Sequence, residues 1–261
     1  MPMPAIIQAM TEGLFGEENL TGLSGSKVIC FPDRVLKIQP VSQEVTDEVT
    51  LMKWLEGRLP VPRVLADAED GGFHYLLMSH MPGTMFCDHS LLEDPDRLLD
   101  CIVEAFVALW QVDVTDCPVS RRLDDRLRLA RQRVEAGLCD TENVEPGTYG
   151  PGGFASPMEL LCWLETHRPS EETFLTHGDC CLPNLFADEN GFCGFIDLGR
   201  GGIGDRWQDI ALIYRSLRHN YDGSYGYTAK AECPAEKLFS RLGIAKDEEK
   251  LRYYILLDEL F

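Results

Sequence analysis

The first third of the chain alternates short apolar runs with turn residues. Lys27–Phe31 and Arg34–Gln39 flank a Pro-Asp turn, and Phe73–Met78 follows Gly71-Gly72. Apolar runs of this length between turn residues predict strands. Residues 43–58 differ, because their apolar positions recur at helical spacing and predict a helix. We therefore expect a strand-rich region with one helix.

After residue 83 the apolar positions recur mainly at helical spacing. Segments with this pattern are 95–113, 119–138, 157–167, 205–219, 233–242 and 247–259. Ser156 and Glu159 form a capping box with Pro157 at the first helical position, which predicts where one helix begins. This part of the chain is therefore predicted to be mostly helical.

Met81-Pro82-Gly83 separates the two regions and predicts a hinge. A strand-rich segment followed by a helical one indicates an α+β protein with two lobes. We expect an N-terminal lobe at residues 1–78, a hinge at 79–83 and a helical C-terminal lobe at 84–261. Binding sites favour the cleft between such lobes.

Composition narrows the class of protein. No apolar run approaches the ~20 residues of a membrane span, and the N-terminus lacks the basic and apolar regions of a signal peptide. Ten scattered cysteines form neither a disulfide framework nor a usual zinc spacing, so free thiols in a reducing cytoplasm are expected. A zinc site from His177, Cys180 and Cys181 is left as an alternative.

The net charge of −19 argues against nucleic-acid binding and against anionic membrane surfaces. It is compatible with a cationic small ligand, although solubility alone also explains it. The sequence shows no sign of an obligate protein partner.

The segment HGDCCLPNLFADENGFCGFIDLGR, at 177–200, contains the most specific pattern in the chain. Asp179 precedes Asn184 by five positions, and Asp197 follows after apolar runs that predict a hairpin. This order is typical of the catalytic and metal-binding loops of kinases. Asp179 is then the candidate base, and Asn184 and Asp197 carry the oxygen ligands that Mg²⁺ prefers.

The first lobe supplies a candidate cation and a partner for it. Lys37 lies on a predicted strand, and Glu48 lies on the apolar side of the following helix. An acid on a buried helix face requires a partner, for which Lys37 is the nearest candidate. The periodicity alone leaves Glu56 as an alternative. The loop Gly22–Lys27 could offer backbone N–H groups to phosphates, with Ser24 as a contact, although it matches no phosphate-binding motif.

With these residues in place, the chain resembles the aminoglycoside 3′-phosphotransferases, bacterial antibiotic-resistance kinases with a protein-kinase-like fold. The resemblance extends from about residue 16 to residue 261. It is densest in WLEGRLPVPRVL (54–65), LLMSHMPG (76–83), THGDCCLPN (176–184), GFIDLGRGGIGDRWQDIAL (194–212) and YYILLDELF (253–261).

The resemblance implies a two-lobed protein-kinase-like fold and transfer of a phosphoryl group from ATP to the 3′-hydroxyl of an aminoglycoside. It implies Asp179 as base, Mg²⁺ held by Asn184 and Asp197, and Lys37 on the phosphates paired with Glu48. It places the backbone of Ser79 and Met81 at the adenine edge. It also directs Asp258, Glu259 and the C-terminal carboxylate of Phe261 towards the cationic drug.

Several positions depart from the family pattern. Relatives tend to have an aromatic residue at the position of Val35, and acids near His80 and His219. Glu145–Ala155 is rich in glycine and proline, and within or beside it Glu142 and Glu145 are candidates for a substrate loop or for a solvated one. Arg200 matches a family position near the site, without an assigned role, and Asp209 is expected to hold the catalytic loop.

Other functions remain open. A kinase of the same fold could act on another antibiotic, choline or a sugar, although the LDELF terminus argues against it. A pseudokinase that binds nucleotide without turnover is a second alternative, against which the complete set of predicted catalytic residues argues. The choice of ATP or GTP, and the range of drugs, are not fixed by the sequence.

Overall fold

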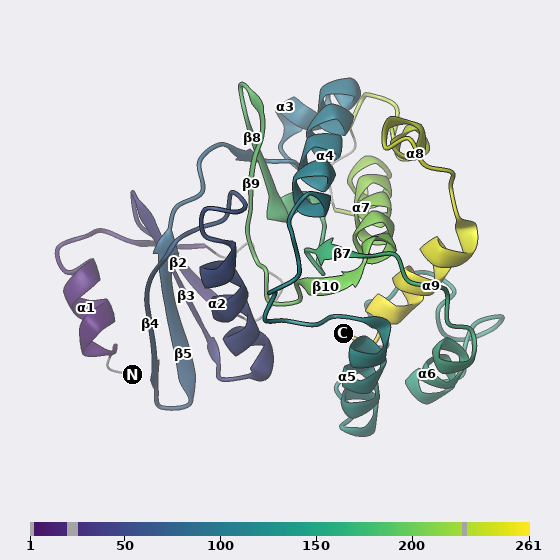
Figure 1. Cartoon of the computed structure of the whole chain (residues 1–261), viewed down its shortest axis with the longest axis horizontal. Coiled ribbons are helices and arrows are strands. Elements are labelled where there is room, and N and C mark those ends of the chain that lie inside the picture. The colour runs from purple at the N-terminus through teal and green to yellow at the C-terminus, as the bar shows by residue number, and fades with distance from the viewer. Residues whose placement is uncertain (1–2, 20–25, 226–228) are drawn as a thin grey trace.

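The computed structural model describes residues 3–19, 26–225 and 229–261. It confirms an α+β fold with two lobes (Figure 1). The smaller lobe contains an antiparallel five-stranded sheet in the order β1-β2-β3-β5-β4. Its strands are β1 (Glu17–Asn19), β2 (Lys27–Cys30), β3 (Arg34–Pro40), β4 (Val64–Asp70) and β5 (Phe73–Ser79).

Two helices cover this sheet, α1 (Ala5–Thr11) and α2 (Gln43–Leu55). Side chains alternate between the faces of a strand. Accordingly Tyr75 and Leu77 of β5 pack with Ile7 of α1, while Leu76 between them joins the core on the α2 side. Ser42 caps the start of α2 by accepting a hydrogen bond from the Val45 N–H.

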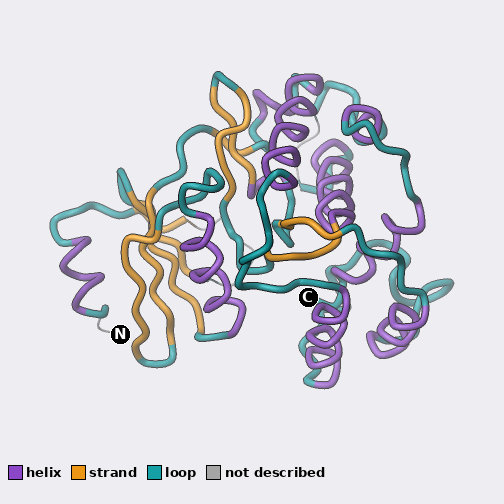
Figure 2. The backbone as a smooth tube through the Cα atoms, viewed as in Figure 1, coloured by secondary structure: helices purple, strands orange, loops and turns teal. Residues whose placement is uncertain are grey.

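The larger lobe is mostly helical (Figure 2). Its helices are α3 (His89–Leu92), α4 (Pro95–Trp110), α5 (Leu123–Glu135), α6 (Pro157–Thr166), α7 (Arg206–Tyr221), α8 (Lys237–Arg241) and α9 (Glu248–Asp258). Two small sheets join them: β6 (Thr84–Met85) with β8 (Leu185–Asp188) and β9 (Gly191–Phe195), and β7 (Thr173–Thr176) with β10 (Gly202–Asp205). No helix among the described residues is both long enough and apolar enough to span a bilayer.

The main hydrophobic core is continuous across the two lobes. Met52 and Leu55 of α2 belong to the same cluster of buried side chains as Leu98 of α4 and Leu217 of α7. The two lobes therefore form one packed unit.

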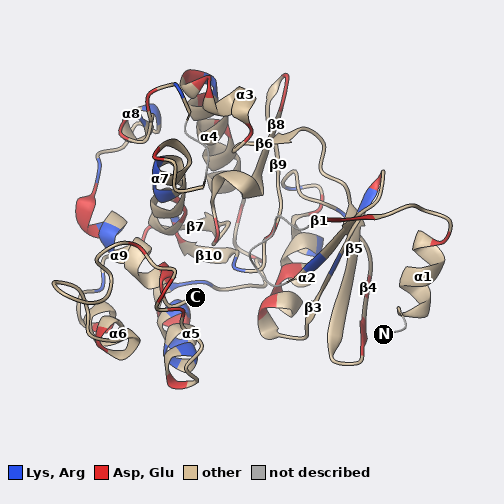
Figure 3. Ribbon diagram, turned by 180° about the vertical axis from the view of Figure 1, so that it is seen from behind, with Lys and Arg blue, Asp and Glu red and all other residues tan. Residues whose placement is uncertain are grey.

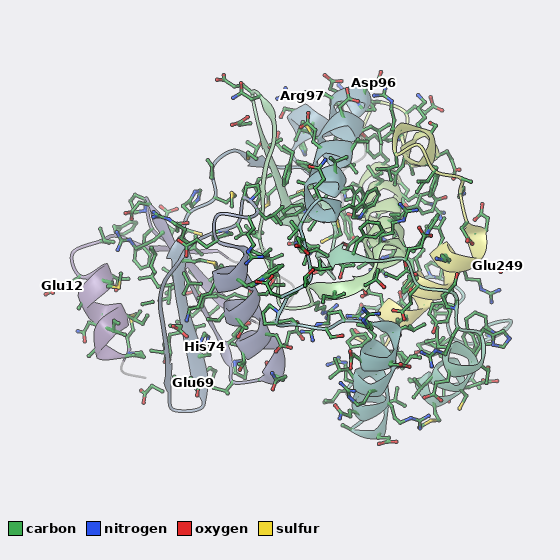
Figure 4. All side chains as sticks on the ribbon, in the orientation of Figure 1. Glu12, Glu69, His74, Asp96, Arg97 and Glu249 are labelled. Atoms are coloured by element: carbon green, nitrogen blue, oxygen red, sulfur yellow. The ribbon has the colours of Figure 1, made fainter. Side chains whose placement is uncertain are left out.

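Within the larger lobe, the β8–β9 hairpin is fixed to α4 at its tip, where Arg97 donates to the Asp188 carbonyl at 2.8 Å (Arg97 is labelled in Figure 4).

Several predicted elements have different limits in the structure. The predicted helix 119–138 begins only at Leu123, because residues 119–122 run alongside β10 instead. The helix predicted at 43–58 ends at Leu55, before Gly57 with φ 75°. The helix predicted at 233–242 is shorter in the structure and spans only α8, Lys237–Arg241. Sequence analysis did not predict α1 or β4. The β4 run VLADAED contains one residue that favours strands, Val64, and is ordered by pairing with β5.

Candidate active site

The loop that contains Asp179 is held by buried polar contacts. The Asp209 carboxylate accepts hydrogen bonds from the His177 and Gly178 N–H groups at 2.7 and 2.8 Å. The His177 ring lies 2.8 Å from the Ile196 carbonyl through Nε2. Burial raises the pKa of Asp209 to about 6. Both residues therefore hold the loop in place, as predicted for Asp209.

Gly178 is required by this loop. Its φ is 82°, a left-handed conformation that side chains other than glycine rarely adopt. A Cβ atom there would lie 1.8 Å from the Arg200 carbonyl oxygen. The close approach brings the loop that ends at Arg200 against the loop that carries Asp179.

Asn184 lies directly beside Asp179. Its Nδ2 donates to the Asp179 carbonyl at 2.9 Å and to the Asp179 Oδ2 at 3.1 Å. The Asn184 carbonyl accepts from the Ile196 N–H at 3.0 Å, which places Asp197 next in the chain beside it. Burial raises the pKa of Asp179 although Arg200 acts in the opposite direction. The raised pKa makes the Asp179 carboxylate more basic than an ordinary aspartate.

Asp197 is the only non-glycine residue with positive φ in the described part of the chain, at 60°. Such a conformation is strained and often marks a functional position. Its Oδ1 accepts from Lys37 Nζ at 2.7 Å, and 38% of its side chain is exposed. Burial opposes ionisation, but Lys37 outweighs it and holds the pKa of the Asp197 carboxyl below its ordinary value.

Lys37 joins the two lobes at this point. Its ammonium lies 3.0 Å from both carboxylate oxygens of Glu48, which is 2% exposed, and Gln39 donates to the same carboxylate at 3.2 Å. Burial raises the pKa of Glu48 despite Lys37. The predicted Lys37–Glu48 pair is present, and the alternative partner Glu56 is exposed.

The donor atoms near Asp197 suit a hard cation. The Asp197 carboxylate and the Asn184 amide oxygen are oxygen ligands, and the amide oxygen accepts no hydrogen bond from any described residue. The alternative zinc site is not supported, because no three His, Cys, Asp or Glu side chains gather to hold a metal among the residues described.

The predicted nucleotide contacts lie at the end of β5. The Ser79 N–H donates to the Arg63 carbonyl at 2.9 Å, so it is not free for a ligand. The Met81 N–H makes no hydrogen bond within the described residues, and the Met81 side chain packs on Gly194. Val35 pairs with Met78 on the adjacent strand. Ser24 lies outside the described residues.

The acids near the C-terminus are held by arginines. Arg215 lies 2.5 Å from Asp258, 3.1 Å from Glu259 and 3.9 Å from Glu145. Glu145 also accepts from His219 Nε2 at 2.9 Å, and its N–H donates to Glu259 at 3.2 Å. These contacts attach the loop of Glu145 to α7 and to the C-terminus.

The terminal residue is surrounded by guanidinium groups. Arg126 lies 4.0 Å and Arg200 5.8 Å from the centre of the Phe261 ring, and Arg133 donates to the Phe261 carbonyl oxygen at 2.6 Å. Arg200 also lies 3.5 Å from Asp258. Figure 3 shows the Lys and Arg positions of α5, coloured blue on the ribbon, beside the C-terminus.

Sequence analysis did not identify Arg126, Arg215 or His219 as parts of this cluster. The sequence around Arg215 could have revealed its role, because nearly every position of α7 around it is buried. A cation within a helix that is buried on most sides requires an anionic partner. The spacing did not reveal which acid that partner is.

Glu259 provides a pH-dependent test of this cluster. Burial raises its pKa to about 7 from an ordinary 4.5, although Arg215 acts against this. The folded protein then binds this proton more tightly than the unfolded chain does. The protonated Glu259 side chain therefore stabilises the fold fully below pH 4.5, and this contribution is lost as the pH rises through 7.

We expect the stability of the wild type, relative to Glu259→Gln, to fall as the pH rises over this range. Urea denaturation of both proteins across the range measures the difference. The exposed Glu189→Gln serves as the control and should show no such trend. A rise with pH in the stability of the wild type relative to Glu259→Gln would contradict the assignment.

The two lobes, the Lys37–Glu48 pair and the loops of Asp179 and Asp197 define a phosphotransferase of the kinase type. A family model described as "Phosphotransferase enzyme family" matches residues 22–232. The chain belongs to the aminoglycoside 3′-phosphotransferase family. It is 38% identical to such an enzyme from Enterococcus faecalis, over 84% of this chain and 79% of that protein, and 36% identical to one from Niallia circulans, over 95% of each.

Solved structures agree with this assignment. Aminoglycoside phosphotransferase APH(3'')-Id from Streptomyces rimosus superposes with a TM-score of 0.81 at 26% identity, covering 97% of this chain and 95% of that one. A second structure of that enzyme, in complex with ADP and streptomycin, has a TM-score of 0.79 over the same shares, again at 26% identity. An aminoglycoside 3′-phosphotransferase of type VIII has a TM-score of 0.79 at 27% identity, covering 98% and 97%.

Proposed function

We propose that the protein transfers the γ-phosphoryl group of ATP to the 3′-hydroxyl of an aminoglycoside and so confers resistance to the drug. The observation that carries this proposal is a pair of contacts, Lys37 to Asp197 between the lobes and Asn184 to Asp179 within the larger lobe. The hydrogen bond from the Ile196 N–H to the Asn184 carbonyl holds the two pairs side by side. The activity of the named relatives supports the choice of acceptor.

The residues divide the chemistry among them. Asp179 accepts the proton of the attacking hydroxyl, which its raised pKa favours. Lys37 neutralises the α- and β-phosphates from a position fixed by Glu48. Asn184 and Asp197 would hold Mg²⁺, which would neutralise charge on the phosphate oxygens. Phosphoryl transfer depends on such positioning more than on covalent chemistry.

We place the nucleotide between a lobe of residues 1–78 and one of residues 84–261, joined by a hinge at 79–83. The Met81 N–H, which makes no hydrogen bond within the described residues, and the Ser79 carbonyl are assigned to the adenine edge. Ser24, outside the described residues, is assigned to the phosphates. Val35 offers an aliphatic surface to the base. ATP is the proposed donor, and GTP is an outcome to be tested.

The cationic drug is assigned to the acids beside Asp179. Asp258 Oδ1 is buried, accepts no hydrogen bond from any described residue and lies 3.5 Å from Arg200 Nη1, so an ammonium group of the drug would replace Arg200 as its cationic partner. Glu259, Glu145 and the carboxylate of Phe261 complete the proposed set. Arg200 lies between Asp258 and Glu44, where it orients the acid that meets the drug. The proposed location is the cytoplasm, where ATP is available.

A substrate panel tests the function directly. With ATP and Mg²⁺ we expect ADP release with kanamycin and neomycin and none with choline, because the site combines several acids for a polycation. Phosphorylation at the 3′ position is checked by NMR of the product. Turnover of choline alone would assign another alcohol, and nucleotide binding without any ADP release would indicate a pseudokinase.

A further inference from the structure

Helix α2 carries Glu48, and three ion pairs connect this part of the smaller lobe to the larger one among the residues described. Asp47 lies 2.7 Å from Arg121, Glu44 lies 3.5 Å from Arg200, and Arg58 lies 2.9 Å from Asp116. In the first pair the side chains are 8% and 17% exposed, whereas in the Arg58 pair they are 40% and 62% exposed. Exposed pairs contribute little, so the Arg121 contact is the one expected to matter.

Arg121 contacts the metal-binding loop with the same atom. Its Nη2 donates to Asp47 Oδ2 at 2.7 Å and to the Gly199 carbonyl at 3.0 Å. Gly199 is two residues after Asp197 and is itself buried. One buried guanidinium nitrogen therefore connects α2 to the loop that carries Asp197.

The backbone of Arg121 is anchored in the larger lobe. Its N–H donates to the Ile203 carbonyl at 2.7 Å, and the Ile203 N–H donates to the Val119 carbonyl at 2.9 Å. Figure 1 shows the segment before α5 passing close to both β10 and α2. The segment that was predicted to be helical is thus an extended support for the Arg121 side chain.

Two routes connect α2 to the loop that carries Asp197. In the first, Glu48 binds Lys37, and Lys37 binds Asp197. In the second, Asp47, which is next to Glu48 on α2, binds Arg121, and Arg121 binds the Gly199 carbonyl. We propose that Arg121 is a positioning residue that fixes α2 against the metal-binding loop, so that Lys37 and Asp197 stay aligned before the nucleotide binds. This inference rests on the proposed phosphotransferase function.

The test compares Arg121→Gln with Arg58→Ala, which removes an ion pair between the same two lobes without touching the metal-binding loop. For Arg121→Gln we expect kcat to fall about tenfold, because a misplaced reacting group slows the chemical step. The KM for kanamycin should stay within about twofold, because the Arg121 side chain contacts Asp47 and Gly199 and none of the proposed drug acids. Arg58→Ala should keep kcat within about twofold, since exposed pairs are weak.

Hydrogen exchange of the metal-free, nucleotide-free proteins provides a readout that does not depend on activity. Arg121→Gln should speed exchange at residues 43–50 and at 197–202 together, whereas Arg58→Ala should affect only residues around 51–59. A general loss of stability would raise exchange across both lobes instead. Asp47→Asn, which keeps the shape of the side chain and the Gly199 contact, is the second variant and should show the same pattern more weakly.

The outcomes separate the two proposals. If the wild type releases ADP with kanamycin but Arg121→Gln and Asp47→Asn match it in kcat and in local exchange, the positioning role is wrong. An equal fall of kcat in Arg121→Gln and Arg58→Ala also overturns the positioning role. It would show that any ion pair between the lobes has the same effect on turnover. If the wild type itself shows no turnover with any acceptor, the proposed function fails, while the exchange pattern still decides whether Arg121 couples α2 to the loop.

Discussion

Replacing Asp179 with alanine is expected to lower kcat by at least ~10²-fold, the usual contribution of a positioned base. The loop should survive the change, because Asn184 keeps its 2.9 Å hydrogen bond to the backbone carbonyl of residue 179, and Asp209 still holds the N–H groups of His177 and Gly178. ADP release at saturating kanamycin and ATP measures the loss.

Drug binding by this variant should be little changed, because the proposed ammonium contacts are on Asp258, Glu259 and the C-terminus. Calorimetric titration of kanamycin into both proteins checks this. The exposed Glu189→Ala is the matched acid-to-alanine control and should retain wild-type kcat. Turnover close to wild type in Asp179→Ala would remove Asp179 from the role of base.

Lys37→Met is expected to impair both stability and activity. It leaves Glu48, 2% exposed, without its cation, and breaking a buried ion pair costs about 3–5 kcal/mol. That is a large share of the roughly 5–15 kcal/mol by which a domain is stable. Loss of a preorganised cation at the phosphates should also lower kcat by about 10²-fold. Urea denaturation and ADP release measure the two effects.

A double variant separates these effects. Lys37→Met combined with Glu48→Leu should recover most of the lost stability, because replacing both partners of a buried pair by apolar groups is close to neutral. Asp197 remains 38% exposed and can be solvated. Activity should stay low, since the cation at the phosphates is still missing. Recovery of turnover along with stability would show that Lys37 only stabilises the fold.

The sequence predicted the catalytic loop well because its geometry is mostly local. Asn184 ends the short 3₁₀ turn η1 (Leu182–Asn184) that follows Asp179, and the β8–β9 hairpin returns the chain to Asp197. The Lys37–Glu48 pair followed from burial, since the apolar stripe of α2 places Glu48 inside. Their roles in catalysis remain predictions until the variants are tested.

The C-terminal acids were harder to interpret from sequence. The terminal motif was singled out, yet the structure surrounds Asp258 and Glu259 with Arg200 and Arg215, and Phe261 with Arg126. These arginines come from three separate parts of the chain. Periodicity indicates which face of a helix is buried and does not specify what lies opposite that face.

The amino-acid sequence by itself determined the order of lobes, the oxygen-bearing residues of the catalytic segment and the family, because each depends on nearby residues or on local patterning. Only the tertiary structure decided that residues 119–122 are extended and that Arg121 contacts both Asp47 and Gly199. These contacts join residues 74 and 78 positions apart and arise from how helices and strands pack. The lost chain entropy is offset by burial across the whole core.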